Sequence, residues 1–349
     1  MRDHATNRTN LAGGFTLLTI HEITDASQWN GMVNAAHGHP MQMWQWGELK
    51  AATGPWTAYR VSAQSDSAVI GCAQVLVRKL PWPFGSICYA PRGPVVNDSN
   101  DYADVADAVA QWCRERFHPV SLKIDPPTTT LSLSKDWAEG DHVLMATTAI
   151  VDLTPDEDAI MKSLHSRNAR NYIRKGAKVG IEVVPGTRED VDTVIAIYHQ
   201  TADRDGFPLH PDEYYHQAFD LLGEVGQLIV AKYEGEIVSF MWNVTSSWGA
   251  SELWAGANDT GRKMRANYPL KWGAMQAAKA VGAERYDMNG LLNDGISEFK
   301  KSFQNEATIW AGTYEKALSP LYHPWEKSLA VFKAIRRRKN APRQKQTNN

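Results

Sequence analysis

The sequence predicts an α+β fold of two layered domains, and three observations support this class. Short strand-like stretches, separated by polar or Pro/Gly turns, alternate with longer helical stretches. The same order of elements occurs twice along the chain. The chain has 349 residues, near the upper limit for a single core, and its 43% apolar and 22% charged residues are typical of a globular protein.

In the first half, a group of strands is followed by a helix and one further strand. The expected strands lie at residues 56–62, 67–79 and 86–90, the helix at about 101–117, and the last strand at 120–124. The second half repeats this order, with strands at 227–233, 237–246 and 250–257, a helix at about 269–281 and a strand at 285–288. Each half is expected to begin with helices. This order is the one that two acyltransferase-type domains of the GNAT class would show.

The domain boundary is predicted near residues 150–154. Thr154 can cap a helix, Pro155 suits its first position, and Glu157 can close a capping box. We expect a first GNAT-like domain at residues 15–150, completed by 312–340, a second at 151–311, and a disordered basic tail at 341–349. No heptad run of useful length occurs, so no long coiled-coil arm is predicted.

The net charge of the chain is only −2, which argues against a general polyanion-binding protein. The charge is nevertheless unevenly distributed along the chain. Seven basic residues and no acid occur between positions 333 and 345: Lys333, Arg336, Arg337, Arg338, Lys339, Arg343 and Lys345. Such a segment binds RNA or an anionic membrane, or merely solubilises a frayed end. Both interpretations stay open.

The sequence predicts a cytoplasmic protein with reduced cysteines. No apolar run approaches the roughly 18 residues of a membrane span, and residues 1–14 lack an apolar signal core. Cys72, Cys88 and Cys113 match no metal-binding spacing, so they are expected to be small apolar fillers. Because the histidines are scattered and no Ser/His/Asp order, HExxH or P-loop occurs, we expect no metal site.

A basic stretch is predicted to form one charged helix face. The offsets of 0, 3, 7 and 11 bring its cations within an arc of roughly 80°. These cations are Arg167, Arg170, Arg174 and Lys178. No acid interrupts residues 162–178. The face can contact the phosphate backbone of tRNA, or it can be an ordinary solvated surface.

Two further stretches are candidate sites. Cations at Arg262, Lys263 and Arg265 precede an expected helix N-terminus, which favours an anion site, although the second glycine of a CoA-binding loop is missing. An exposed loop is the alternative there. Downstream, Ile296, Phe299 and Phe303 are spaced to anchor a short helical segment. That segment would hold Lys300 rigidly, as electrostatic catalysis requires, although most lysines are ordinary surface residues.

Several blocks together resemble the FemABX family of aminoacyl-tRNA-dependent peptidyltransferases. They are QMWQWGELK at 42–50, QVLVRKLP at 74–81, YAPRGPV at 89–95, KIDP at 123–126, RNARNYIRKGA at 167–177, ANYPLKW at 266–272, YDMNG at 286–290 and FK at 299–300. Their order and spacing over residues 40–315 carry the resemblance. The missing coiled-coil arm places the chain with the shorter members.

The resemblance implies two GNAT-like domains, no cofactor, an aminoacyl-tRNA donor, and UDP-MurNAc-pentapeptide or lipid II as acceptor. It implies that the acceptor is held by Lys50, Arg204, Trp254, Tyr268 and Asn289. It also implies a catalytic Lys300 next to Phe299, with Asp125 as a candidate base. The tRNA-binding set would be Arg167, Arg170, Arg174, Lys178, Arg262, Lys263 and Arg265.

The predicted function is therefore transfer of an aminoacyl group from charged tRNA to the stem-peptide amine of a peptidoglycan precursor, building the interpeptide bridge. The ester is already activated, so alignment and a fixed positive charge would supply most of the catalysis. The basic tail is compatible with peripheral contact at the inner face of the plasma membrane. Two alternatives stay open: a CoA-dependent N-acyltransferase on the same fold, and a non-catalytic RNA-binding protein.

Overall fold

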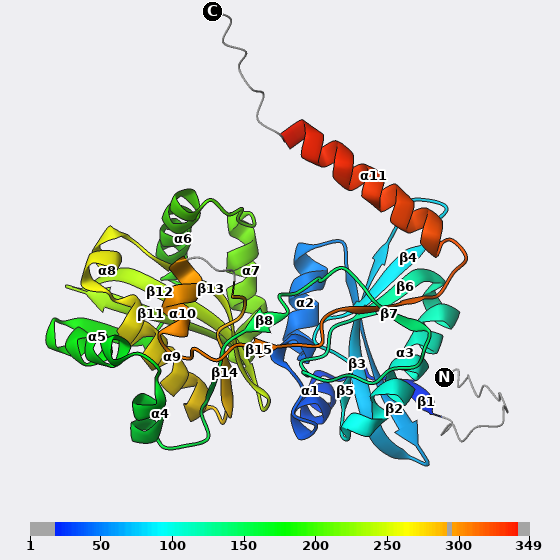
Figure 1. The fold of residues 1–349 in the computed structure, drawn as a ribbon, viewed down its shortest axis with the longest axis horizontal. Coiled ribbons are helices and arrows are strands. Elements are labelled where there is room, and N and C mark those ends of the chain that lie inside the picture. Colours follow the sequence, from blue (N-terminus) through cyan, green and yellow to red (C-terminus); the bar gives the residue numbers. More distant parts are fainter. Residues whose placement is uncertain (1–17, 292–294, 341–349) are drawn as a thin grey trace, which may run out of the picture.

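The computed structural model describes residues 18–291 and 295–340, with side chains described as far as residue 334. It has the predicted α+β class, with two sheets that lie side by side and helices packed on their faces (Figure 1). The predicted disordered tail, 341–349, and residues 15–17 of the first predicted domain lie outside the described residues.

The first sheet has the strand order β1-β2-β3-β4-β6-β16-β7, and β5 pairs with β3 at one side. β4 and β6 run parallel, and the other pairs are antiparallel. The bounds are β1 Thr19–Glu22, β2 Thr57–Ser65, β3 Ala68–Lys79, β4 Ser86–Ala90, β5 Val95–Val96, β6 Pro119–Ile124, β7 Trp137–Glu139 and β16 Tyr314–Ala317. Residues 71–77 of β3 are all buried, as expected for a central strand covered on both faces.

The second sheet has the order β10-β11-β12-β13-β14-β9, with β13 and β14 parallel. Its strands are β9 Ile150–Asp152, β10 Ile181–Pro185, β11 Gly226–Tyr233, β12 Glu236–Ser246, β13 Gly249–Ala257 and β14 Arg285–Asp287. A two-stranded ladder, β8 (Thr147–Thr148) with β15 (Thr308–Ile309), lies where the chain crosses between the halves (Figure 1).

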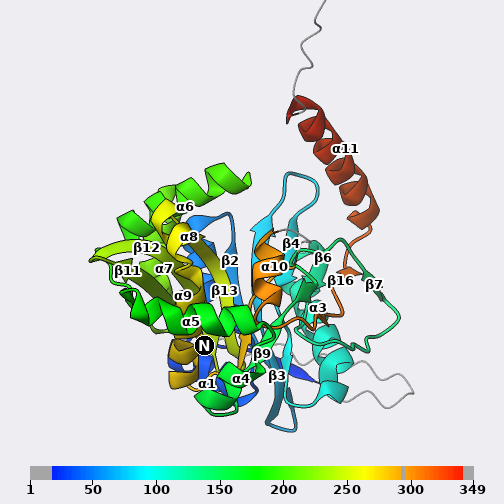
Figure 2. The ribbon, with the colours of Figure 1, turned by 60° about the vertical axis from the view of Figure 1, so that its left-hand side comes forward.

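Most helices pack on the sheets, and one, α11, projects away from them (Figure 1). The helices are α1 Ala26–Ala35, α2 Trp44–Thr53, α3 Tyr102–Phe117, α4 Glu157–Ser163, α5 Arg167–Lys178, α6 Val191–Asp205, α7 Asp212–Leu222, α8 Asp259–Met264, α9 Asn267–Ala280, α10 Gly295–Lys301 and α11 Tyr322–Asn340. Short 3-10 turns occur at Pro40–Gln42, Ser99–Asp101 and Gly223–Val225. Figure 2, turned from the first view, shows that α11 still projects away from the two sheets.

The predicted strands and long helices of both halves are present, with ends that differ by at most three residues. Two expectations were wrong. Each half begins with a strand, β1 in the first and β9 in the second, rather than with helices. Thr154 does not cap α4, because its backbone and hydroxyl bind the Asp152 carboxylate, while Asp156 accepts from the Ala159 N–H at 2.8 Å and is the N-cap.

A strand from late in the chain completes the first sheet. β9, near the predicted boundary, pairs with β14 in the second sheet, and β16, from beyond residue 311, pairs with β6 and β7 in the first. We propose on this basis the division predicted from the sequence, with 312–340 belonging to the first domain.

The halves share a continuous apolar core. Trp29, Val33 and Leu49 of the first half are fully buried in the same cluster as Val194 and Phe240 of the second. Because α2 packs against α7 here, the two sheets are held together by hydrophobic burial rather than by a linker alone. The three cysteines are free and buried, as predicted.

Candidate active site between a cationic cavity and a buried ion pair

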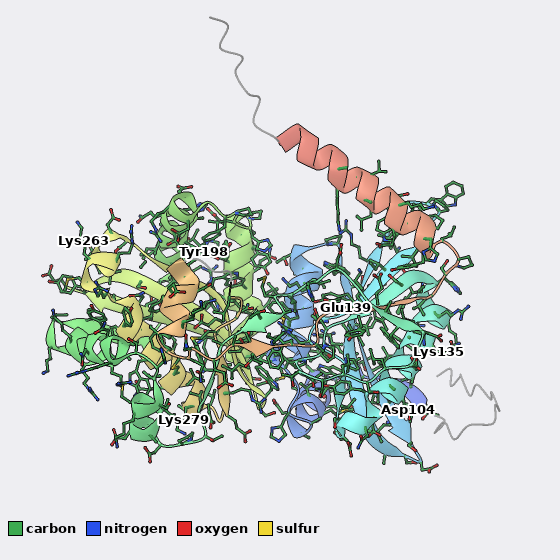
Figure 3. All side chains as sticks on the ribbon, in the orientation of Figure 1. Asp104, Lys135, Glu139, Tyr198, Lys263 and Lys279 are labelled. Carbon is green, nitrogen blue, oxygen red and sulfur yellow. The ribbon has the colours of Figure 1, made fainter. Side chains whose placement is uncertain are left out.

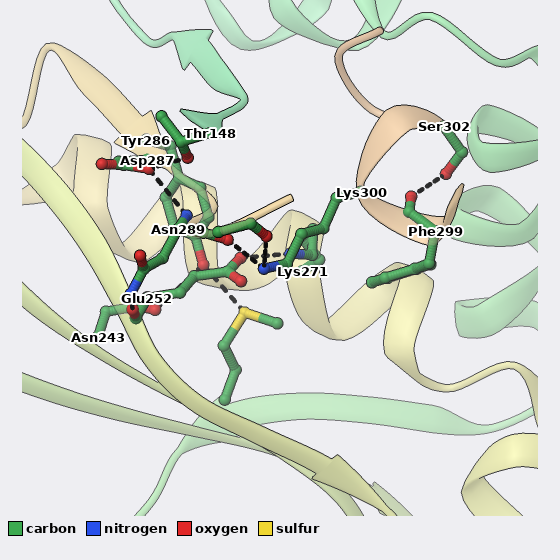
Figure 4. Close-up of polar contacts among 12 residues, drawn as sticks. Thr148, Asn243, Glu252, Lys271, Tyr286, Asp287, Asn289, Phe299, Lys300 and Ser302 are labelled. Atoms are coloured by element: carbon green, nitrogen blue, oxygen red, sulfur yellow. Dashed lines mark hydrogen bonds and ion pairs between the residues drawn. The ribbon is translucent and has the colours of Figure 1, made fainter. Parts of the chain in front are cut away.

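Lys300 lies on α10, a short helix held to the second half by Phe303. Phe303 is 1% exposed and Phe299 is partly buried against the same cluster. Ile296 is 45% exposed, so the prediction that it anchors the segment was wrong. The Lys300 Nζ donates to the backbone carbonyls of Asn289 and Gly290, the latter at 2.9 Å. The ammonium is therefore fixed in direction (Figure 4).

Beneath Lys300 lies a buried ion pair, Lys271 of α9 with Glu252 of β13 (Figure 4). Lys271 is 1% exposed, and its Nζ lies 5.2 Å from the Phe299 ring centre. Burial lowers the pKa of the Lys271 ammonium below its ordinary value, Glu252 opposes this shift, and the charge of Lys300 adds to it. Two lysines and one carboxylate thus share a small, poorly solvated volume.

A second buried carboxylate orders the backbone that Lys300 contacts. Asp287 accepts from the Thr148 hydroxyl at 2.5 Å and from the Asn289 N–H at 2.8 Å. Burial raises the pKa of Asp287, and these hydrogen bonds oppose the rise. Asn289 has a φ of 48° and donates its side-chain amide to the Glu252 carbonyl at 3.0 Å. Its side chain is therefore already engaged within the protein.

Aromatic rings connect this polar cluster to the basic helix α5. The Tyr268 ring centre lies 5.0 Å from that of Phe299 and 5.0 Å from that of Tyr172 on α5. The Arg265 guanidinium stacks 4.3 Å above Tyr172. Tyr268 is thus part of a rigid wall between Lys300 and Arg265.

This wall borders a cavity of about 1220 Å³ in the second half. β14 pairs with β13 at Ala250 and Ser251, whereas β13 continues to Ala257, and the last residues of β13 line the cavity. Its lining brings together six residues predicted from the sequence: Arg204, Arg262, Lys263, Arg265, Tyr268 and Phe299. Figure 3 shows Lys263 at the outer edge of this half. A roomy cavity with cations at its rim suits a ligand with an anionic end.

Gly261 has a packing reason that the sequence did not reveal. A Cβ at this position would lie 2.2 Å from the Val238 carbonyl oxygen of β12. The Gly261 N–H is taken by the Asn258 side chain at 2.9 Å, which caps α8. The glycine therefore lets α8 approach the sheet, and α8 in turn presents Arg262 and Lys263 to the cavity.

Lys50 and Trp254 both contact Tyr214, in a separate cluster between the halves. Lys50 Nζ donates to the Tyr214 hydroxyl at 2.8 Å and lies 4.5 Å from the Trp46 ring centre. Trp254 packs edge-on against Tyr214, with ring centres 5.7 Å apart. Burial lowers the pKa of Lys50 to about 8. Arg204 lies elsewhere, at the cavity, where it pairs with Asp205 at 2.9 Å.

Asp125 is buried in the first half, directly after β6. It accepts from the Tyr89 hydroxyl and from the Arg92 N–H, both at 2.7 Å. Burial raises the pKa of Asp125 to about 6, although the Arg92 charge and these hydrogen bonds oppose the rise. Arg92 also donates to the Met145 carbonyl at 3.0 Å, and its charge acts on Asp287 as well. Among the described residues, no hydrogen bond joins Asp125 to Lys300.

The predicted basic helix exists as α5, and Ser166 caps it by accepting from the Asn168 N–H at 3.1 Å. Arg167, Arg174 and Lys178 are exposed, as an RNA-contacting face requires. Arg170 is partly buried and donates to the Leu164 carbonyl, so it stabilises the start of its own helix. Gly176 lets α5 pack closely on α9, since a Cβ there would lie 2.7 Å from Pro269.

Four residues of this region were not predicted from the sequence: Lys271, Glu252, Asp287 and Arg92. A signal existed for Lys271, because it follows Leu270 in a helix whose buried positions recur at Ala274 and Ala278. A lysine within an apolar stripe predicts a buried partner. In the part of the chain that the structure describes, no group of three or more His, Cys, Asp or Glu side chains is placed to hold a metal ion.

Comparison with known proteins agrees with this architecture. A family model described as an acetyltransferase (GNAT) domain matches residues 163–301. The lipid II:glycine glycyltransferase of Staphylococcus saprophyticus is 30% identical over 217 residues, which cover 56% of this chain and 52% of that protein. Its Staphylococcus aureus counterpart is 30% identical over 209 residues, covering 54% and 49%. The chain thus spans about half the length of these curated relatives.

Among solved structures, FemX has the same fold. Its crystal structure superposes with a TM-score of 0.77 at 19% identity, covering 89% of this chain and 99% of FemX. The match extends over both halves and therefore confirms the tandem GNAT-like architecture. The chain is thus similar to lipid II:glycine glycyltransferases over about half of their length, and it shares its fold with FemX.

Proposed function

We propose that the protein transfers an aminoacyl group from charged tRNA to the stem-peptide amine of a peptidoglycan precursor. The observation that carries this proposal is the position of Lys300. Its ammonium is held by two carbonyls, next to Phe299, which lines the cationic cavity. The names of the staphylococcal relatives, lipid II:glycine glycyltransferases, support the acceptor class.

The chemistry asks for alignment and charge stabilisation. A neutral amine attacks the ester carbonyl, the carbonyl oxygen becomes negative, and the ribose hydroxyl of the tRNA leaves as the new amide forms. Lys300 stabilises the negative oxygen, and the buried Lys271 keeps the local field positive. A cation in a site of low dielectric constant acts more strongly than one in water, and preorganised charges of this kind typically contribute about 3–4 kcal/mol.

The donor would approach across the cavity of the second half. Arg262, Lys263 and Arg265 lie at the cavity lining and would contact phosphates near the tRNA end. The exposed Arg167, Arg174 and Lys178 of α5 extend this positive surface. Tyr268 and Phe299 offer aromatic faces on which a terminal base or the aminoacyl group could pack.

The acceptor, UDP-MurNAc-pentapeptide or lipid II, would approach from the contact between the halves. We assign its phosphates or stem peptide to Lys50 at this contact and to Arg204 at the cavity, so that the acceptor extends from one to the other, and we assign its packing to Trp254. Asn289 supports the Lys300 carbonyl contacts and acts as a positioning residue. The proton of the attacking amine passes through substrate or solvent. Asp125 is only the fallback base, because both of its oxygens already accept hydrogen bonds.

Substitution of Lys300 tests the proposal. Lys300→Met, assayed with charged tRNA and acceptor, should lower kcat by about 10²–10³-fold with a small change in KM. Lys301→Met is the matched control, because Lys301 is the neighbouring residue of the same helix and pairs with Glu298 at 2.9 Å. Unchanged turnover of the Lys300 variant would rule out the assigned role.

Two competing functions give different results in the same preparation. The GNAT-type cavity favours a CoA-dependent N-acyltransferase as the second candidate, and acetyl-CoA binding in calorimetry would support it. A non-catalytic RNA-binding protein would bind uncharged tRNA as tightly as charged tRNA and form no product. Incubation with mixed charged tRNAs and either acceptor, followed by product mass, identifies the transferred residue.

Within the described part of the chain, no helix has the length and apolarity needed to cross a bilayer. We propose that the protein works in the cytoplasm, at the inner face of the plasma membrane, where charged tRNA and a lipid-linked acceptor are both present.

A further inference from the structure

We propose that the turn at Trp82 and helix α11 together form a docking surface for an anionic lipid bilayer. We call this the Trp82 surface and define its apolar part as Trp82, Val331 and Phe332. Its basic part is Arg78, Lys79, Lys327 and Lys333. The inference deepens the proposed function, on which its biological purpose rests, because a lipid-linked acceptor would lie in that bilayer.

Trp82 is the most exposed large apolar side chain among the described residues. It is 94% exposed, at the tip of the turn between β3 and β4. The turn is closed by the Leu80 N–H donating to the Gly85 carbonyl at 2.8 Å, and prolines on both sides of Trp82 restrict its backbone. A tryptophan held outward on a stiff turn can insert at a lipid interface with little loss of conformational freedom.

The same turn contacts α11. Phe84 packs edge-on against Trp325 at the base of the helix, with ring centres 5.2 Å apart. From there α11 projects beyond the first half (Figures 1 and 2). Further along, Val331 is 60% exposed and Phe332 is 63% exposed. The turn and the helix therefore present apolar side chains from one connected region of the molecule.

Basic residues accompany these apolar ones. Arg78, Lys79 and Lys327 are exposed, and Lys333 pairs with Asp141 at 3.2 Å. The sequence continues α11 with Arg336, Arg337, Arg338 and Lys339, and it contains no acid between residues 327 and 345. Apolar side chains with surrounding cations complement a bilayer that carries negative headgroups.

An RNA would use the cations but leave the exposed Trp82, Val331 and Phe332 in water. A bilayer uses both, since the indole ring enters the headgroup region while the lysine and arginine side chains stay at its anionic surface. The observations therefore favour a lipid partner over a nucleic acid.

Vesicle flotation of the full chain tests the surface. We expect binding to phosphatidylcholine vesicles that contain about one-third phosphatidylglycerol, weak binding to phosphatidylcholine alone, and release at high salt. Trp82→Ser/Phe332→Ser should weaken binding by about tenfold or more. Val281→Ser is the matched control, because Val281 is 60% exposed but lies in the second half, and its binding should be unchanged.

A second variant tests the charges separately. Arg78→Gln/Lys79→Gln/Lys327→Gln should remove most of the preference for phosphatidylglycerol. The proposal is overturned if the full chain does not float with anionic vesicles, if the Trp82 variant binds as the native chain does, or if uncharged tRNA competes the vesicles away. Flotation needs neither substrate, so its result is independent of transfer activity. Transfer to a soluble acceptor should be unchanged in the Trp82 variant.

Discussion

The two halves share one plan but differ where the parallel strands end. In the first half, β4 and β6 pair and the space beyond them is filled by Tyr89, Asp125 and Arg92. In the second, β14 ends at Asp287 while β13 continues to Ala257 beside a cavity of about 1220 Å³. Each half places a buried aspartate at this point, Asp125 after β6 and Asp287 at the end of β14.

This difference indicates that the two halves do not carry equivalent sites. The second half keeps an open cavity with cations at its lining and Lys300 beside it, whereas the first half has closed the corresponding region with hydrogen bonds. Arg92 connects the two, because its charge opposes the upward pKa shifts of both Asp125 and Asp287. We therefore propose that the first half supports the site of the second rather than repeating its chemistry.

The largest effect is expected from removal of the buried cation in the second half. Lys271→Met leaves the Glu252 carboxylate without its partner, which should lower the free energy of unfolding by about 3–5 kcal/mol. Lys316→Met is the control in the first half, where Lys316 pairs with Asp107. Asp107 is 30% exposed and still accepts hydrogen bonds from Trp137 and Ser134 after the substitution. Urea denaturation should show a loss of about 1 kcal/mol for the control. Equal losses of unfolding free energy in the two variants would show that the Lys271 pair is no more important to stability than the exposed pair of the first half.

The closed site of the first half is tested through the pH dependence of stability. Burial raises the pKa of Asp125 from its ordinary value to about 6, so the folded chain binds more protons than the unfolded one between about pH 4 and 6. The free energy of unfolding should therefore fall as pH rises through this window, by up to about 3 kcal/mol. Asp125→Asn should lack this fall.

Asp66→Asn is the control for that measurement, since Asp66 is exposed in the turn between β2 and β3. Urea unfolding at a series of pH values, compared with the native chain, checks the result. A difference between Asp125→Asn and the native chain that does not vary with pH would contradict the assigned burial cost.

A smaller effect is expected from filling the close contact that sets the cavity wall. Gly261→Ala places a Cβ against the Val238 carbonyl, which should cost about 1–3 kcal/mol and displace Arg262 and Lys263. Gly31→Ala in α1 meets nothing within 4 Å and should stabilise the chain by up to about 1 kcal/mol. Thermal unfolding compares the two, and KM for charged tRNA should rise for the Gly261 variant. A stabilised Gly261 variant would show that α8 has room to move.

The sequence predicted most elements because hydrophobic pattern and turn residues act locally. The strand at 86–90 and the basic helix at 167–178 illustrate this. Residue blocks likewise indicated Lys300 and its neighbour Phe299. The pairing of Lys271 with Glu252 was not predictable, because a local pattern does not show which strand faces a helix. The separation of Lys50 from Arg204 has the same origin, since it depends on how α2 packs against α7 across the two halves.

The smallest effect concerns the contact between the halves and appears only above neutral pH. Burial against Trp46 and Tyr214 lowers the pKa of Lys50 to about 8, so its charge is lost as pH rises through that value. If this charge holds an acceptor phosphate, KM for the acceptor should rise between about pH 7 and 9 in the native chain. Lys50→Arg should flatten that rise, because a guanidinium stays protonated, while differing only a few-fold from the native chain at pH 7. Lys301→Arg should leave the profile unchanged. Parallel pH profiles for Lys50→Arg and the native chain would show that the acceptor binds at the cavity of the second half rather than at this contact.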